Sequence, residues 1–264
     1  MPTTPLLFSS AAFFGRPLAG TMRRAAEAGY GGVEVMVTKD PASQDGAEMR
    51  RLADAHGLRI GALHAPALLL TRRVWGTDPV GKIDRAIQEA ERAEVPLVVM
   101  HPPFRWQHGY RRWLLEELPA IEDRTGVVVA IENMFPVHVG SRPIRLHANA
   151  DLDQLEGLPD LVLDTSHAAV ARHDVLEVRR RFGPRLRHVH LSDNAGRGWD
   201  SHLPPGHGVL PIGAFLDDLV ASGYAGAVSL EVDLRTWMRD PVALGRIMVE
   251  MRERLEPHLR GADR

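Results

Sequence analysis

Short apolar runs rich in β-branched residues recur along the whole chain, and each is followed by turn residues and then by a longer segment with helical periodicity. This alternation is typical of a parallel sheet that is covered by helices. Eight such runs predict eight strands, which we place at Leu6–Ser9, Val33–Val37, Ile60–His64, Leu97–His101, Val127–Glu132, Leu161–Asp164, Leu186–Leu191 and Ala227–Glu231.

The strands are apolar throughout, and the chain has the length of eight strand-helix units. Leu97 to Met100 and Val127 to Ile131 are apolar at every position, as in strands that are buried on both faces. The 264 residues give 264 ÷ 8 = 33 residues per unit, and no linker divides the chain. We therefore predict an α/β fold, a single-domain (β/α)8 TIM barrel over residues 1–264, in preference to an open doubly wound sheet.

Helical periodicity fills the intervals between the strands, and several of these segments end at a glycine. The irregular stretch Asp193–Pro211, rich in Gly, Pro and His, follows the seventh strand and is a candidate functional loop. The helices are expected at Leu18–Ala28, Gly46–His56, Val80–Glu94, Arg111–Thr125, Leu176–Phe182, Ile212–Ser222 and Val242–Leu255, with the weakest pattern at Asn149–Leu155.

Composition excludes several classes of chemistry. The chain has no cysteine, so disulfides, thiolate metal sites and a cysteine nucleophile are excluded, and any metal is held by nitrogen and oxygen. A net charge of −2 disfavours a nucleic-acid partner without excluding one. The N-terminal residues lack a secretory pattern, and no stretch approaches the roughly 20 apolar residues of a membrane span. We expect a cytoplasmic protein with no membrane partner.

Residues of the metal-ligand type close most of the predicted strands. In a parallel barrel the active site lies at the carboxyl ends of the strands, so these side chains are directed toward one axis. One such residue alone is usually structural, but six on consecutive strands indicate a shared site. The six are His64, His101, Glu132, Asp164, His190 and Glu231.

Electrostatics favours a cation among these residues. Two carboxylates held about 4 Å apart repel by about 4 kcal/mol at an effective dielectric constant of about 20, unless a proton or a cation neutralises them. A divalent ion satisfies Glu132, Asp164 and Glu231 together, and with one imidazole the set suits Mn, Mg, Co or Zn. His167, just past the sixth strand, and the loop residues Asp200 and His202 extend the ligand set.

At these residues the sequence resembles the xylose isomerase-like, AP endonuclease family 2 superfamily of TIM barrels. The resemblance covers nearly the whole chain, from the Gly-Tyr-Gly-Gly-Val-Glu segment that begins at Gly29 through Glu231. The segments that carry it are His64-Ala65-Pro66, His101-Pro102-Pro103, Ile131-Glu132-Asn133, Leu163-Asp164-Thr165-Ser166-His167, His190-Leu191-Ser192-Asp193-Asn194 and Asp200-Ser201-His202-Leu203-Pro204-Pro205-Gly206-His207-Gly208.

Two branches of that superfamily imply different metal contents. The sugar isomerase and epimerase branch implies one ion on Glu132, Asp164, His190 and Glu231, with the two glutamates as the proton-transfer pair. The endonuclease IV branch implies three zinc ions. Its pattern maps onto His64, His101, Glu132, Asp164, His167, His190, Asp200, His202 and Glu231, and all nine positions are filled.

The leading expectation is a divalent-metal-dependent isomerase or epimerase that acts on a small carbohydrate by proton transfer through a metal-bound enediolate. Glu132 and Glu231 are the expected base and acid, and His167 and Arg197 the expected contacts to the substrate. One ion is expected, and up to three remain open. The alternatives are a zinc-dependent phosphodiester hydrolase resembling endonuclease IV, and a non-catalytic barrel that binds metal and sugar. A homo-oligomer also remains open.

Other side chains enter these expectations as supporting groups. Glu34, closing the second strand, is expected to orient a neighbouring ligand or a sugar hydroxyl. Lys39 and Lys82 are the only lysines and close no strand, which disfavours amine catalysis, and no nucleotide-binding motif is present. Aromatic walls that stack on a sugar are expected from Trp75, Phe104, Trp106, Trp199 and Trp237. An enzyme that acts on DNA would instead need a basic rim, for which the candidates are Arg72, Arg73, Arg105, Arg142, Arg145 and Arg197, and Trp75 could insert into the base stack as a wedge.

Overall fold

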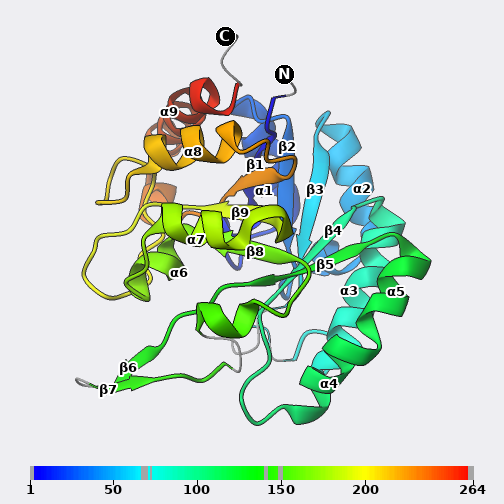
Figure 1. Ribbon diagram of the computed structural model, residues 1–264. Helices are drawn as coiled ribbons and strands as arrows, with labels where there is room; N and C mark the ends of the chain where they lie inside the picture. Colours follow the sequence, from blue (N-terminus) through cyan, green and yellow to red (C-terminus); the bar gives the residue numbers. More distant parts are fainter. Residues whose placement is uncertain (1–2, 67–70, 72, 140–141, 148–150, 261–264) are drawn as a thin grey trace.

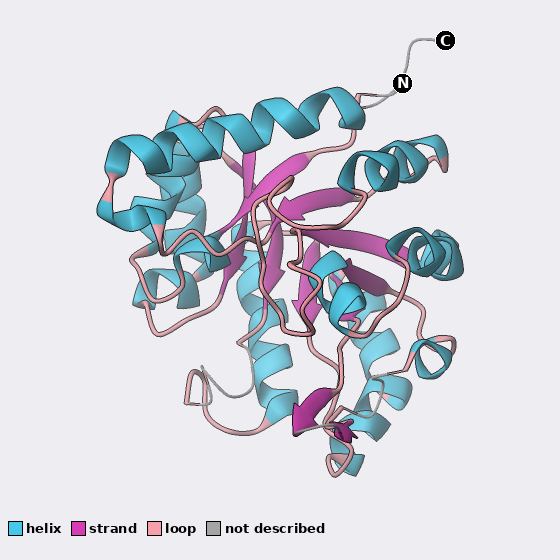
Figure 2. Cartoon of the chain, turned by 90° about the vertical axis from the view of Figure 1, so that its left-hand side faces the viewer, coloured by secondary structure: helices cyan, strands magenta, loops and turns pink. Residues whose placement is uncertain are grey.

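The computed structural model describes residues 3–66, 71, 73–139, 142–147 and 151–260, and it has the predicted architecture (Figures 1 and 2). Eight parallel strands close into a barrel in the order β1-β10-β9-β8-β5-β4-β3-β2. The strands are β1 (Leu6–Ser9), β2 (Gly32–Met36), β3 (Arg59–His64), β4 (Leu97–Met100), β5 (Val128–Glu132), β8 (Leu161–Asp164), β9 (Leu186–Leu191) and β10 (Ala227–Leu230).

Helices surround this barrel, as Figure 2 shows. They are α1 (Leu18–Glu27), α2 (Gly46–Ala55), α3 (Pro79–Ala93), α4 (His108–Glu116), α5 (Leu118–Thr125), α6 (Thr165–Val170), α7 (Val175–Phe182), α8 (Ile212–Ala221) and α9 (Pro241–Leu259). Short 3-10 turns lie at η1 (Ser10–Phe13), η2 (Pro41–Gln44), η3 (Leu152–Leu155), η4 (Gly183–Arg185) and η5 (Trp237–Arg239). Among the described residues, no helix has both the length and the apolar character needed to cross a membrane.

Two helix predictions need correction. The single helix expected over Arg111–Thr125 is wrong, because α4 ends at Glu116 and α5 begins at Leu118 with Pro119 in its first turn. Proline lacks an N–H group and its ring clashes with the carbonyl four residues earlier, so α4 cannot continue through Pro119, whereas proline is tolerated in the first turn of a new helix. The weak pattern at Asn149–Leu155 yields only the turn η3, and residues 149 and 150 lie outside the described part.

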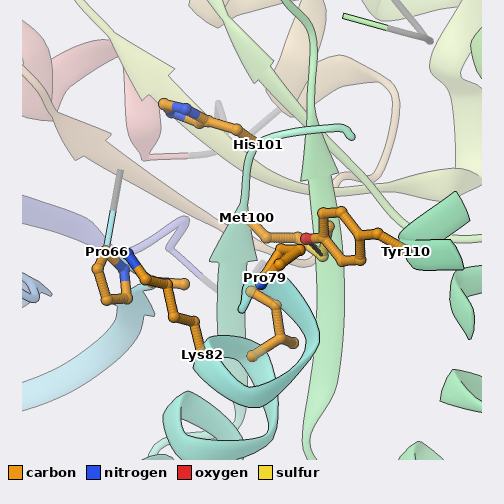
Figure 3. A pocket seen from close by; sticks show the side chains of 8 residues that line it. Pro66, Pro79, Lys82, Met100, His101 and Tyr110 are labelled. Atoms are coloured by element: carbon orange, nitrogen blue, oxygen red, sulfur yellow. Dashed lines mark hydrogen bonds between the residues drawn. The ribbon is translucent and has the colours of Figure 1, made fainter. Parts of the chain in front are cut away.

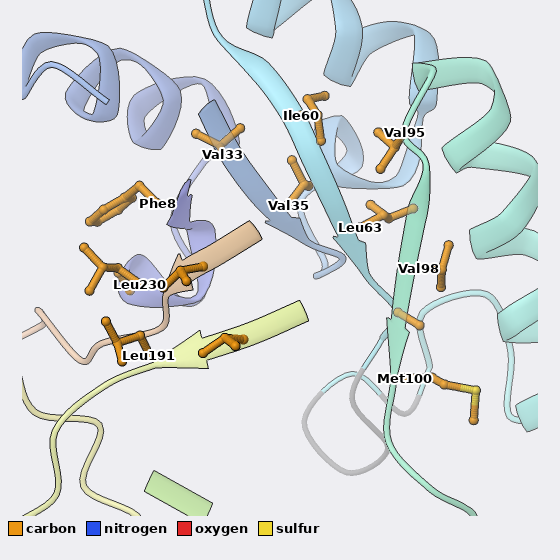
Figure 4. Close-up of a cluster of buried hydrophobic side chains, with 14 of the residues drawn as sticks. Phe8, Val33, Val35, Ile60, Leu63, Val95, Val98, Met100, Leu191 and Leu230 are labelled. Carbon is orange, nitrogen blue, oxygen red and sulfur yellow. The ribbon is translucent and has the colours of Figure 1, made fainter. Parts of the chain in front are cut away.

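Two apolar layers hold the barrel. The larger layer fills the space between strands and helices with outward-facing side chains such as Phe8, Val35 and Leu63 (Figure 4). A smaller cluster is made of Ala62, Leu97, Val99, Ala130 and Val162. Burial of each large aliphatic or aromatic side chain contributes about 1.5–3 kcal/mol. Because these layers are apolar, polar side chains inside the barrel must find their hydrogen-bond partners among one another.

A hairpin that the sequence did not predict follows β5. Its antiparallel strands β6 (Val137–Val139) and β7 (Arg142–Ile144) extend beyond the carboxyl ends of the barrel strands in Figure 1. At the opposite end, the two ends of the described chain meet, since the Thr4 N–H donates to the Leu259 carbonyl. The hairpin thus lies on the side of the barrel where the strand-end residues gather.

The loop after β9 is folded around one buried carboxylate. Asp193 accepts hydrogen bonds from the backbone N–H groups of Asn194, Gly206, Gly208 and Leu210, at 2.8 to 3.0 Å. Backbone bonds in both directions also pair Asp193 with Leu203. These contacts fix the path of the loop that carries Asp200 and His202.

Gly208 is expected to be essential to this loop. A Cβ atom at this position would overlap the Asn194 carbonyl and the Asp193 carboxylate, neither of which can move freely. We predict that Gly208→Ala lowers the free energy of unfolding by about 1–3 kcal/mol, as overpacking does. Urea denaturation measures this, with Gly109→Ala as control because a Cβ there meets nothing within 4 Å. Equal stability of the two variants would contradict the role given to the loop.

Candidate metal centre

The strand ends converge into overlapping clusters of potential ligands. Glu132, Asp164, His190 and Glu231 each offer one donor atom, and these four atoms lie within 4.8 Å of one another. The same limit holds for His64, His101 and Glu132, and for Asp164, His167 and His202. Of the nine expected ligands, eight fall into these groups, and Asp200 adjoins the third group through His167 and His202.

His190 lies among the carboxylates of the four-residue cluster. Its Nδ1 atom is 2.8 Å from Glu132 Oε1 and 2.8 Å from Glu231 Oε2. Asp164 stands beside it, since Asp164 and His190 are register partners on β8 and β9. An imidazole nitrogen and carboxylate oxygens are therefore presented to one point by four different strands or strand ends.

Three buried carboxylate oxygens in this cluster make no hydrogen bond, namely Glu132 Oε2, Asp164 Oδ2 and Glu231 Oε2. Two of them still face imidazole nitrogens, because His101 Nε2 lies 3.1 Å from Glu132 Oε2 and His190 Nδ1 lies 2.8 Å from Glu231 Oε2. Buried polar atoms are nearly always partnered, so these oxygens together with Asp164 Oδ2 favour a ligand. Burial raises the pKa of Asp164 to about 6 against the effect of His167 and His202. Burial also opposes ionisation of Glu132, but His190 and His167 hold the pKa of Glu132 well below its ordinary value.

His64 and His101 approach Glu132 from the neighbouring strand ends. Their Nε2 atoms lie 3.7 Å and 3.1 Å from Glu132 Oε2. The Nδ1 atom of His64 is 2.9 Å from the Ala65 carbonyl, which fixes its proton on Nδ1. The Nε2 lone pair of neutral His64 therefore faces the cluster.

His167 and His202 share Asp200 between them. Their Nε2 atoms lie 3.3 Å and 2.8 Å from Asp200 Oδ2, while their Nδ1 atoms lie 2.9 Å and 2.8 Å from the backbone carbonyls of Asn133 and Glu231. Although burial lowers the pKa of His202, Asp164 and Asp200 raise it to about 10. The same kind of arrangement as at His64 thus directs two more Nε2 atoms into the site.

The donor chemistry fits divalent metal ions. Carboxylate oxygens and imidazole nitrogens, without sulfur, are the ligands of Zn²⁺, Mn²⁺ and Co²⁺, and the oxygen-rich four-residue cluster also suits Mg²⁺. A cation would neutralise the three clustered carboxylates and satisfy their unpartnered oxygens. The donor atoms are numerous enough for one ion in the four-residue cluster and for further ions beside it.

A cavity of about 360 Å³ opens onto the cluster. His101, His167, Asp200, His202 and Glu231 line one part of it. Glu132 is 1 % exposed and is not among the lining residues. The apolar lining residues are Ala11, Phe14, Met36, Met134, Phe135 and Val232, and the Phe135 ring lies 4.8 Å from the His167 ring. Of the four-residue cluster, Glu231 is therefore the carboxylate that borders the cavity.

The residues around this cavity differ from those expected from the sequence. Arg197 is exposed and does not line it, whereas Arg235 does, paired with Asp233. None of the five expected aromatic residues lines it; Trp75 packs against the core, and Trp106 and Trp199 are exposed. Phe14 and Phe135 take their place. The signal available for Phe135 was its position three residues after Glu132, in the loop that follows a strand end.

Lys82 lies outside the metal cluster. It is buried on α3, its Nζ donates to the Thr71 carbonyl at 3.0 Å, and burial lowers its pKa. Figure 3 shows His101 extending from the end of β4 away from Lys82. Lys82 therefore holds the segment after β3 to α3, and it offers no amine to the cavity that contains Glu231.

Metal affinity should increase with pH. Burial lowers the pKa of His190, but Glu34, Glu231 and Glu132 together raise it well above its ordinary value, so in the metal-free protein a proton occupies Nδ1. An ion at Nδ1 must displace this proton, and affinity gains about tenfold per pH unit for each proton released. Competition with a chromophoric chelator at several pH values measures this. A dissociation constant that does not change with pH would contradict proton displacement.

The chain is similar in sequence to several known proteins. A 38% identical protein of unassigned function from Mycobacterium tuberculosis aligns over 223 residues, which is 77% of this chain and 80% of that protein. Fructoselysine 3-epimerase of Escherichia coli O157:H7 is 26% identical over 147 residues, 54% of this chain and 52% of that enzyme.

The fold has close counterparts among solved structures. The crystal structure of a D-tagatose 3-epimerase-like protein superposes with a TM-score of 0.72 at 23% sequence identity, covering 97% of each chain. Residues 22–254 match the family model described as xylose isomerase-like TIM barrel. The chain belongs to the xylose isomerase-like TIM barrel family.

Proposed function

We propose that the protein is a divalent-metal-dependent isomerase or epimerase of a small sugar or related hydroxy-carbonyl compound. The observation that carries this proposal is the cluster of Glu132, Asp164, His190 and Glu231, whose donor atoms lie within 4.8 Å of one another at the edge of a 360 Å³ cavity. Family membership and a sequence relative named as a sugar-derivative 3-epimerase support the reaction class.

Glu132, Asp164, His190 and Glu231 would hold the ion, which when bound supplies Lewis-acid polarisation of a carbonyl and its neighbouring hydroxyl oxygen. Glu231 borders the cavity and accepts the proton from the carbon beside the carbonyl. Glu132 would be the second proton carrier, returning to the carbon a proton supplied through His101, which borders the cavity with its Nε2 atom 3.1 Å from Glu132 Oε2. The pair thus serves both as ligands and as proton carriers.

His167 and the apolar wall position the substrate. The Nε2 atom of His167 faces the cavity beside Asp200, where it can donate to a substrate hydroxyl. Phe14 and Phe135 also line the cavity, with the Phe135 ring against His167, and would exclude water from the reacting carbon. The substrate would thus present both hydroxyl groups and an apolar surface to the cavity.

Phosphodiester hydrolysis is a second candidate, because donors for up to three ions converge in overlapping clusters. The surroundings favour it less. Arg145 is paired with Asp151, Arg197 does not line the cavity, and Arg72 lies outside the described residues. Trp75, the expected wedge, packs against the core. Neither Arg145 nor Arg197 therefore contributes to a basic rim for the DNA backbone at the cavity.

Removal of either proton carrier should abolish turnover. We predict that Glu132→Gln and Glu231→Gln reduce kcat by about 10²–10⁴-fold, the usual contribution of general acid–base catalysis. The assay follows incorporation of solvent deuterium into a panel of ketoses and hydroxy-carbonyl compounds, with Mn²⁺ or Zn²⁺ present. Glu48→Gln, at a surface carboxylate paired with Arg51, is the control and should keep full activity.

The same assay separates the candidate functions. Full activity in either glutamine variant would contradict the proton-transfer pair. Cleavage of an abasic DNA duplex, with no exchange in any sugar, would contradict the isomerase and favour the hydrolase. Metal binding without turnover of either substrate class would leave a non-catalytic barrel.

A further inference from the structure

Glu34 is a carboxylate inside the barrel that the proposed reaction does not use. It lies on β2 and is fully buried. Three side chains contact it. Ser9 Oγ donates to Oε1 at 3.3 Å, and the Nε2 atoms of His188 and His190 lie 2.7 Å and 3.1 Å from Oε2. Removing a carboxylate from water costs free energy, and these three contacts offset part of that cost.

His190 differs from the other histidines of the site in the nitrogen that it presents. His64, His167 and His202 place Nδ1 against a backbone carbonyl and direct Nε2 into the clusters. In His190 the order is reversed, because Nε2 contacts Glu34 and Nδ1 faces Glu132 and Glu231. Its partner is a charged carboxylate, which is a stronger acceptor than a carbonyl.

We propose that Glu34 is a positioning residue that holds the Nε2 proton of His190 and thereby makes Nδ1 of His190 the metal-binding atom. The inference rests on the metal-binding part of the proposed function and not on the reaction. Since an ionised carboxylate only accepts hydrogen bonds, His190 must carry a proton on Nε2, and its lone pair is left on Nδ1. The carboxylate also increases the electron density that the imidazole offers to the metal.

His188 keeps Glu34 in place. Its Nε2 atom lies 2.7 Å from Glu34 Oε2, the same carboxylate oxygen that His190 contacts. β2 and β9 are not neighbours in the sheet, so the Glu34 contacts span the inside of the barrel. The orientation of His190 is therefore determined by side chains within the barrel, independently of the loops.

The decisive variant is Glu34→Gln, tested on the full chain with Zn²⁺ alone. The amide NH₂ of glutamine can face His190 Nε2, which favours the tautomer with its proton on Nδ1, where the metal should bind. We expect affinity for Zn²⁺ to fall about 10–100-fold, as for other partners of metal-bound histidines. The matched control is Glu89→Gln, another fully buried carboxylate, which lies on α3 and accepts from Gly46 and Arg92.

Chelator competition measures both affinities, and ¹⁵N NMR of histidine-labelled protein identifies the metal-bound nitrogen. The control should bind Zn²⁺ within about twofold of the parent protein, because distant sites act independently. Equal affinities of Glu34→Gln and the control would overturn the proposal. If Glu34→Gln does not fold, the parent protein decides: Zn²⁺ on Nδ1 with a proton on Nε2 of His190 supports the proposal, and Zn²⁺ on Nε2 overturns it.

These readouts need no substrate, so the two proposals fail separately. A parent protein that binds Zn²⁺ through Nδ1 of His190 but turns over no sugar would contradict the proposed function and leave the role of Glu34 intact. A sugar epimerase whose affinity for Zn²⁺ is unaffected by Glu34→Gln would do the opposite.

Discussion

Repulsion among buried carboxylates is the constraint on which the site depends. Glu132, Asp164 and Glu231 are held together at the end of the barrel, and each has a buried oxygen without a hydrogen bond. The strands that carry them are fixed by the closed sheet and by the apolar layers around it, so the carboxylates cannot move apart. Protons on the neighbouring histidines relieve the repulsion in the metal-free chain, and a divalent cation relieves it more completely.

The barrel and its loops make different contributions to this arrangement. The strands present the four-residue cluster and, deeper inside, the Glu34 contacts that orient His190. The loop after β9 brings Asp200 and His202 to the edge of the cavity, and it keeps its path through the buried Asp193 carboxylate. The four-residue cluster thus depends on the strands, whereas the edge of the cavity depends on the loop after β9, as in barrels in which loops vary on a constant sheet.

The sequence predicted the residues that the sheet positions better than those that the loops position. Glu132 and Asp164 could be placed because strand alternation is local and parallel strands end on one face. The break before Pro119 is local as well, but the helical periodicity of Arg111–Thr125 continues across it and predicts one helix instead of two. The cavity wall could not be derived, because the positions of Phe14 and Phe135 depend on loop paths set by contacts between distant segments. The partners of Glu34 depend on the register across the whole barrel.

The proposed function requires one cation shared by Glu132, Asp164, His190 and Glu231. Anomalous X-ray scattering from crystals grown with Zn²⁺ or Mn²⁺ tests this directly, because it locates the ion without reference to activity. We predict an anomalous peak at about 2.0–2.2 Å from Nδ1 of His190 and from an oxygen of each carboxylate. A loaded crystal with no peak among these four residues, or with the ion on Nε2 of His190, would contradict the account.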